Sequence, residues 1–280
     1  KTARRRAGVI VALLLGVGVA QAQPAAEFFA GKRITVIVGT AAGGGYDTYA
    51  RMIARYMPAH IPGQPTFIVQ NMPGAGSNVS AAYIQNVAPK DGTFIGAYQS
   101  GLVLEPLIGS RPINHDPSKA QYLGSANDDI YICIARSDAP VKEFKDALTT
   151  EMVMGASNAS SSADYSLMLN AVLGAKFKIV LGYQGSRQIS LAIEKGEAQG
   201  ACGFAWPSIS VTQPGRFESG ALKVIVQAHS IGHPDLNKKG VPRAGDFART
   251  AEDKAVLDFF FSQTRFGRPF AVASGVPADR

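Results

Sequence analysis

The chain contains the stretch ITVIVGTAAGGGYDTYARMIARYM at residues 34–57, and this stretch decides the fold class. Residues 33–38 are short, apolar and rich in β-branched side chains, which predicts a buried strand. The glycine-rich loop at 39–45 follows, and a helical pattern then runs to about Met57. A strand that enters a helix through a loop of small residues is typical of α/β proteins.

The same order of elements occurs twice along the chain. The first half is predicted to hold strands at 33–38, 66–69 and 93–98, a second helix at 78–87, and small-residue loops at 39–45 and 73–77. The second half is predicted to hold strands at 152–154, 177–180 and 201–204, helices at 163–173 and 187–194, and loops at 155–162 and 182–186. This alternation predicts a mainly parallel sheet flanked by helices in each half. Identity between the halves is low, so the generic rhythm of an α/β chain is the alternative.

The chain is predicted to form two lobes joined by a hinge. We expect the first lobe at 23–126, the second at 127–227, and a return to the first lobe over 228–280. The helix near 251–263 and the strand near 270–273 are both expected to rejoin the first lobe. A chain that crosses twice between lobes forms a natural hinge, and closure of such hinges around ligands is well known.

The N-terminus has the pattern of a secretory signal peptide. Three arginines at 4–6 precede an apolar run at 7–20, and a small-x-small site ends at Ala22. We therefore expect residues 1–22 to be cleaved and the chain to be exported to the periplasm. The alternative is a membrane anchor, but the run is shorter than the roughly 20 residues that a spanning helix needs. The formal net charge is +7, much of it in this segment, so the remainder gives no support for nucleic-acid binding.

Several kinds of chemistry lack a sequence signal. Cys133 and Cys202 could pair in an oxidising compartment or be two buried thiols, and both possibilities stay open. No metal-spaced Cys/His cluster, nucleotide motif or G-x-S-x-G motif is present, so we expect no cofactor and no metal. The serine-rich run at 157–162 leaves an exported hydrolase or transferase as an alternative function. No base partner for it is evident, and such a run is more often a helix start.

The small-residue loops predict an anion site. Each loop falls at the carboxyl end of a strand, where ligands of open α/β sheets bind, and each begins a helix. The first-turn amides of a helix are unpaired and lie at the positive end of its dipole. Two loops that face two others could therefore hold a small carboxylate without any arginine. Asp47 either interacts with a helix dipole or contacts the ligand. Tyr183 could belong to the core, but its place between glycines favours the lining of the pocket. Arg187 is the one cation beside a candidate loop, and a solvated surface position is the alternative for it.

These motifs resemble a known family. Together with 34–57, the runs IVQNMPGAGSNVSAAYIQNVAPKDGT (68–93), GYQGSRQISLAIEKGEAQGACGF (182–204) and GRPFAVASGVPADR (267–280) resemble the tripartite tricarboxylate transporter receptors, also called Bug or TctC-like periplasmic solute-binding proteins. The resemblance implies a two-lobed, type II-like periplasmic binding fold. It also implies a receptor that catalyses no reaction. Such a receptor captures a small organic anion and delivers it to the membrane permease subunits of a secondary transporter.

The resemblance also implies ligand-binding residues in both lobes, and we expect the protein to be a monomer. They are Thr40, Ala41, Gly45, Asp47, Gly76, Ser77 and Asn78 in the first lobe, and Ser160, Ser161, Tyr183 and Gly185 in the second. The chain departs from the family at Thr-Ala-Ala (40–42), at Phe-Ala-Trp (204–206), and in stopping at Arg280, where a truncated sequence is expected. A binding protein that serves a sensor instead of a permease is the remaining alternative.

Overall fold

A computed structural model describes residues 25–108, 112–158 and 161–280. The expected signal peptide at 1–22 therefore lies outside the described residues. Within those ranges, no helix has both the length and the apolar character needed to cross a membrane.

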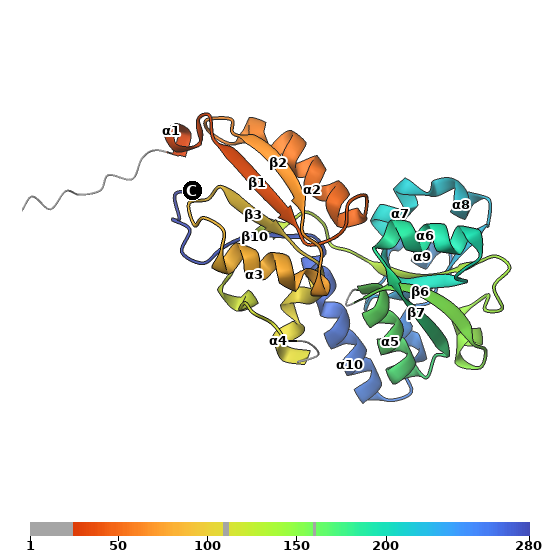
Figure 1. The fold of residues 1–280 in the computed structure, drawn as a ribbon. Coiled ribbons are helices and arrows are strands. Elements are labelled where there is room, and N and C mark those ends of the chain that lie inside the picture. The colour runs from red at the N-terminus through yellow and green to blue at the C-terminus, as the bar shows by residue number, and fades with distance from the viewer. Residues whose placement is uncertain (1–24, 109–111, 159–160) are drawn as a thin grey trace, which may run out of the picture.

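The structure has two five-stranded sheets, one in each lobe (Figure 1). The first has the order β2-β1-β3-β10-β4 and the second the order β7-β6-β8-β5-β9. The strands of the first sheet are β1 (Arg33–Val38), β2 (Thr66–Asn71), β3 (Phe94–Ala97), β4 (Gln121–Ser125) and β10 (Pro269–Val272). Those of the second are β5 (Tyr131–Arg136), β6 (Met152–Ser157), β7 (Phe177–Tyr183), β8 (Gly200–Ala205) and β9 (Leu222–Ala228). The predicted α/β class and the two-lobed architecture are confirmed.

Each sheet contains one reversed strand at the same position in the order. β1 pairs in parallel with β2 and β3, whereas β10 is antiparallel to both of its neighbours, β3 and β4. In the second sheet β6 pairs in parallel with β7 and β8, whereas β5 is antiparallel to β8 and β9. The reversed strands β5 and β10 are those that the chain enters after crossing from one lobe to the other. The sheets are therefore mainly parallel, and the exceptions mark the hinge.

Helices cover the sheets and close the cores. They are α1 (Ala25–Phe29), α2 (Gly45–Tyr56), α3 (Asn78–Asn86), α4 (Glu105–Ile108), α5 (Ser161–Leu173), α6 (Ser186–Lys195), α7 (Trp206–Thr212), α8 (Pro214–Glu218), α9 (Pro234–Lys238) and α10 (Ala251–Phe261). In the second sheet, Tyr131 and Cys133 of β5 belong to the core under α5, while Ile132 and Ile134 belong to the core under α6. This alternation follows from the two-residue period of a strand, and it explains why β5 is apolar throughout.

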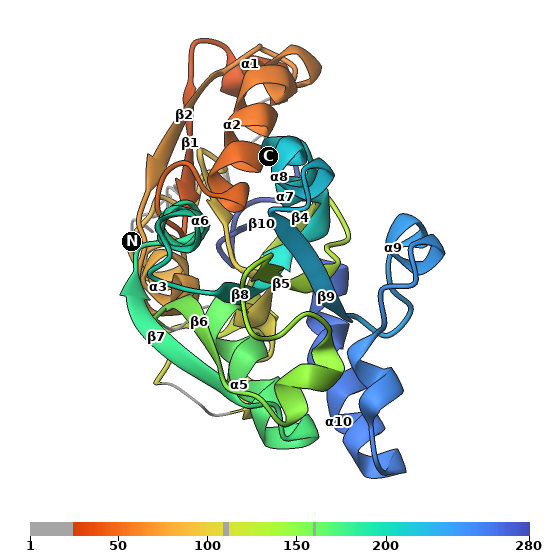
Figure 2. The same ribbon diagram turned by 90° about the vertical axis from the view of Figure 1, so that its right-hand side faces the viewer.

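Helix α10 corrects one prediction about the lobes. Its residues Leu257, Phe260 and Phe261 are buried in the second lobe's core, and the helix lies beside α5 (Figures 1 and 2). The prediction that the chain returns to the first lobe after residue 227, with this helix, is therefore wrong. The apolar face of α10 packs against the ring of Tyr165 in α5, whose centre is 5.0 Å from the centre of the Phe260 ring. β10 and the residues that follow it rejoin the first lobe.

The two cysteines form a disulfide. Cys133 of β5 and Cys202 of β8 lie on neighbouring antiparallel strands, and both are fully buried. The open question from the sequence is thus settled in favour of pairing. The bond joins the reversed strand to the parallel part of the second sheet.

Candidate functional site

The first loop, residues 39–45, is held by the carboxylate of Asp47. Asp47 is 2% exposed and accepts hydrogen bonds from the backbone N–H of Gly43 (2.8 Å), from Arg51 Nε (2.9 Å) and from Asn71 Nδ2 (2.9 Å). Although burial opposes ionisation, these hydrogen bonds lower the pKa of Asp47 below its ordinary value. Both carboxylate oxygens are therefore occupied within the first lobe. These hydrogen bonds hold the first loop in its conformation.

The second loop, residues 73–77, is tied to the first by Ser77. Its hydroxyl donates to the carbonyl of Gly39 (3.1 Å) and accepts from the backbone N–H of Gln99 (3.0 Å). The close approach requires a glycine, because a Cβ on Gly39 would lie 2.3 Å from Ser77 Oγ. Asn78 donates from Nδ2 to the carbonyl of Ala75, 2.6 Å away. Ser77 thus fixes three segments at the carboxyl edge of the first sheet.

Two buried polar atoms at this edge lack hydrogen-bond partners among the described residues. They are Thr40 Oγ1, in the first loop, and Asn78 Oδ1, at the start of α3. Buried polar atoms without partners are uncommon in folded proteins and call for an explanation such as a missing ligand or water. Both residues belong to the set expected from the sequence.

The third loop, residues 155–162, begins α5 through its serines. The backbone N–H of Ser157 donates to Ser162 Oγ (3.0 Å), and Ser166 Oγ donates to the carbonyl of Ser162 (3.0 Å). These bonds are of the kind that begin and continue a helix. Ser161 directs its backbone N–H toward Gln99 Oε1 of the first lobe, 3.5 Å away. Ser160 lies outside the described residues.

The fourth loop, residues 182–186, faces the first loop across the lobes. A Cβ on Gly185 would lie 4.0 Å from Ala41 Cβ, and one on Gly44 would lie 3.5 Å from Ser186 Oγ. A Cβ on Gly43 would lie 3.4 Å from the side chain of Arg187. The loops that begin α2 and α6 therefore meet at the junction of the lobes. Tyr183, in contrast, is half-buried and packs against the core under α6.

An ion pair at the hinge was missed by the sequence reasoning. Arg268 and Asp129 are 3% and 0% exposed, and Arg268 Nε lies 2.9 Å from Asp129 Oδ2. Burial raises the pKa of Asp129 to about 6, an effect that the charge of Arg268 opposes. The guanidinium also lies under the start of α2, because a Cβ on Gly45 would be 3.1 Å from Arg268 Nη2. The only signal in the sequence was an arginine before an apolar strand, in the run GRPF.

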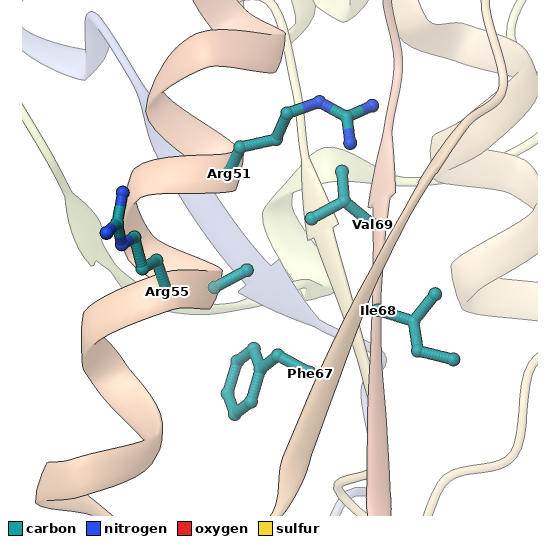
Figure 3. A pocket seen from close by; sticks show the side chains of 6 residues that line it. Arg51, Arg55, Phe67, Ile68 and Val69 are labelled. Atoms are coloured by element: carbon teal, nitrogen blue, oxygen red, sulfur yellow. The ribbon is translucent and has the colours of Figure 1, made fainter.

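A surface groove lies away from this junction. Arg51, Ala54 and Arg55 of α2, with Phe67, Ile68 and Val69 of β2, line an open hollow of about 450 Å³ (Figure 3). Figure 3 shows Phe67 directed toward α2 and Ile68 directed away from it. Because β2 is the edge strand of its sheet, the groove is on the outer side of the first lobe.

The sequence comparisons find relatives over part of the chain. No family model matches it. A Cupriavidus necator protein described as the UPF0065 protein in the gbd 5' region is 32% identical over 143 residues, which are 50% of this chain and 42% of that protein. An Agrobacterium vitis protein described as the UPF0065 protein in the TAR-I ttuE-ttuC' intergenic region is 28% identical over 195 residues, 66% of this chain and 53% of that one. The chain thus spans about half the length of the curated relatives it matches.

The solved structures share the fold. The periplasmic binding protein BugD has a TM-score of 0.69 at 19% identity, with 88% of this chain and 78% of that chain covered. R. palustris Rpa4515 with adipate has a TM-score of 0.65 at 17% identity, with 87% and 90% covered. MatC from Rhodopseudomonas palustris with bound malate has a TM-score of 0.63 at 20% identity, with 88% and 79% covered. The chain therefore has the fold of these binding proteins, and the neighbours are of the Bug and TctC type that the sequence resembles.

Proposed function

We propose that this protein is an extracytoplasmic receptor that captures a small organic anion of the carboxylate type. We further propose that it acts as a monomer in the periplasm and delivers this solute to the membrane permease subunits of a tripartite tricarboxylate-type secondary transporter. The observation that carries the proposal is the convergence of loops from both lobes on one junction. The start of α2 faces the start of α6, and Gln99 of the first lobe reaches the start of α5.

Electrostatics and unpaired polar atoms support an anion at this junction. The helices α2, α5 and α6 all begin at it, and the first-turn amides of a helix favour negative charge. The Thr40 hydroxyl is available to donate a hydrogen bond to a carboxylate, whereas Asn78 Oδ1 is an acceptor and suits a hydroxyl group of the solute or a water. Among similar structures, MatC holds malate and Rpa4515 holds adipate, so a carboxylate is the first class of solute to test.

A thermal-shift series tests the proposal directly. Malate, citrate and adipate are compared with adipamide, a neutral molecule that matches adipate in length. A ligand at about 100 times its Kd stabilises the folded state by about 2.7 kcal/mol, so a binding carboxylate raises the melting temperature clearly. We expect at least one acid to raise it and the diamide to leave it unchanged. A flat response to every organic anion, or an equal response to the diamide, would refute the proposal.

A substitution at the junction tests where the solute binds. Gly76 and Gly185 both have positive φ angles, so valine there would strain the backbone as well as fill space. Gly44 has φ −85° and accepts a side chain without such strain. We expect Gly44→Val to abolish the ligand-induced shift while the melting temperature without ligand changes little. Normal binding by this variant would mean that the solute is held elsewhere.

A further inference from the structure

The two crossings between the lobes lie side by side. The backbone N–H of Asp129 donates to the carbonyl of Thr264 (3.2 Å), and that of Ala126 donates to the carbonyl of Arg268 (3.0 Å). The contact is tight enough that a Cβ on Gly267 would lie 2.5 Å from the backbone nitrogen of Asp129. The Asp129–Arg268 ion pair therefore joins one crossing to the other.

The Arg268 side chain contacts both lobes at once. Its guanidinium stacks on the ring of Tyr46 in α2 of the first lobe, 4.2 Å from the ring centre. Its Nη2 donates to Ser208 Oγ in α7 of the second lobe, 3.1 Å away. The position of this guanidinium thus depends on where each lobe lies.

A second polar link crosses the same junction. The hydroxyls of Tyr46, in the first lobe, and Tyr131, in the second, are 2.8 Å apart. Ser100 of the first lobe strengthens this link. Its backbone N–H donates to the Tyr46 hydroxyl (3.0 Å), and its Oγ lies 3.2 Å from the Tyr131 hydroxyl and 3.5 Å from the Tyr46 hydroxyl. We call Tyr46, Asp129, Tyr131, Ser208 and Arg268 the hinge cluster.

We propose that Arg268 and the other residues of the hinge cluster are positioning residues that set the affinity for the solute by holding the lobes closed. The proposal rests on the proposed function but needs no contact between the cluster and the solute. A protein that binds only in its closed form has an apparent Kd that increases as the closed fraction decreases. The links from Arg268 to Ser208 and from Tyr46 to Tyr131 join groups of different lobes, so opening the hinge separates them.

Two conservative variants remove one link each, and each has a matched control. Ser208→Ala removes the acceptor of Arg268, and Ser210→Ala, on the same helix, is its control. Tyr131→Phe removes the hydroxyl that contacts both Tyr46 and Ser100. Tyr165→Phe is its control, because the Tyr165 ring packs 4.8 Å from the Tyr131 ring while its buried hydroxyl has no partner among the described residues.

Ligand-free scattering tests the closed state without any solute. We expect Ser208→Ala and Tyr131→Phe to have a larger radius of gyration in small-angle X-ray scattering than the wild type, and both controls to match the wild type. Equal radii for all five proteins would overturn the inference. The radius of gyration is measured without ligand, so this test of the hinge cluster can be made even if no carboxylate binds. A negative result here is therefore distinct from a failure of the proposed function.

Binding kinetics test the link to affinity, with malate and adipate as probes. Trp206, the single tryptophan, begins α7 two residues before Ser208 and reports binding by its fluorescence. The loss of one hydrogen bond is expected to raise Kd by about 3- to 10-fold, through faster dissociation. A shared closing step requires the same factor for every ligand that binds. Factors that differ widely between malate and adipate would indicate direct contact with the solute and overturn the inference, as would unchanged Kd values.

Arg268→Lys tests the arginine itself. Lysine keeps a positive charge beside Asp129, but a single ammonium group cannot pair with Asp129, reach Ser208 and stack on Tyr46 together. We expect this variant to be folded, to scatter as an opened protein and to bind at least as weakly as Ser208→Ala. If Arg268→Lys has the radius of gyration and the affinity of the wild type, a positive charge at this position is sufficient and the guanidinium of Arg268 does not hold the lobes closed.

Discussion

Replacing both Cys133 and Cys202 with alanine is expected to make the protein much easier to unfold. The disulfide joins residues separated by 69 positions, and the chain-entropy relation for a loop of that size gives about 4 kcal/mol of stabilisation. Whole domains are stable by only about 5–15 kcal/mol, so this loss is a large share of the total. Because both sulfur atoms are fully buried, the alanine variant also loses packing, at a cost of about 1 kcal/mol or more.

Urea unfolding of three samples separates these two costs. Oxidised wild type, wild type reduced in the unfolded state and then refolded, and the double alanine variant are compared by circular dichroism. The first and second samples differ by the cross-link alone, and the second and third differ mainly by packing. We expect a drop of about 4 kcal/mol at the first step and a smaller drop at the second. The reasoning is refuted if the oxidised and reduced proteins unfold at the same urea concentration, or if a thiol reagent finds two free thiols in unreduced, unfolded protein.

Three further outcomes are expected. A Cβ on Gly203 would lie 2.4 Å from the backbone at the start of α5, so Gly203→Ala should weaken carboxylate binding in a calorimetric titration. Gly220 also has a positive φ but has open space around it, so the control Gly220→Ala should lower stability by only about 1–2 kcal/mol and leave the affinity unchanged. Burial raises the pKa of Asp129 from 3.8 to about 6, so the contribution of Asp129 to stability is full below about pH 4 and is lost as the pH rises to about 6. Urea unfolding from pH 4 to 7 should show this decrease in the free energy of unfolding, and Asp129→Asn should remove it. The lowered pKa of Asp47 has the opposite sign, so its contribution is present at neutral pH and lost on acidification, and Asp47→Asn should cost about 1–3 kcal/mol at pH 7 by urea unfolding.

The local order of elements could be predicted because it depends on short-range patterns. The β-branched run at 33–38, the glycines that follow and the amphipathic helix to Tyr56 each lie within a few residues of one another. The first and second loops were placed correctly after the carboxyl ends of β1 and β2 for the same reason, whereas β6 extends to Ser157 and so takes in the first residues of the predicted third loop. Period and turn chemistry need no knowledge of the rest of the chain.

The packing of α10 could not be predicted in this way. Its sequence AEDKAVLDFFF fits a helix whose apolar face can cover either lobe. The choice depends on shape, since the rings of Phe260 and Phe261 fit against Tyr165, a residue of a distant segment. A sequence pattern indicates that a face is apolar, but it does not say which core has room for it.

The role of Asp47 was left open by the sequence for a related reason. An acidic residue in the first turn of a helix fits both a dipole partner and a ligand contact. Its hydrogen bonds to Gly43 and Arg51 are each made within four positions, yet the bond from Asn71 depends on the parallel pairing of β1 with β2. The sheet register therefore decides that the carboxylate braces the loop.

The hinge ion pair was missed because the relation between its two residues appears only in the sheet topology. β5 and β10 hold equivalent places in their sheets, and each is the strand that the chain enters after a crossing. Asp129 comes just before β5, and Arg268 comes just before β10. Two crossings between the same two lobes have to pass close to each other, so opposite charges at equivalent positions can meet there. Arg187, the one cation beside a candidate loop, is exposed, whereas the buried pair lies at the crossings, where the low dielectric strengthens the interaction between charges.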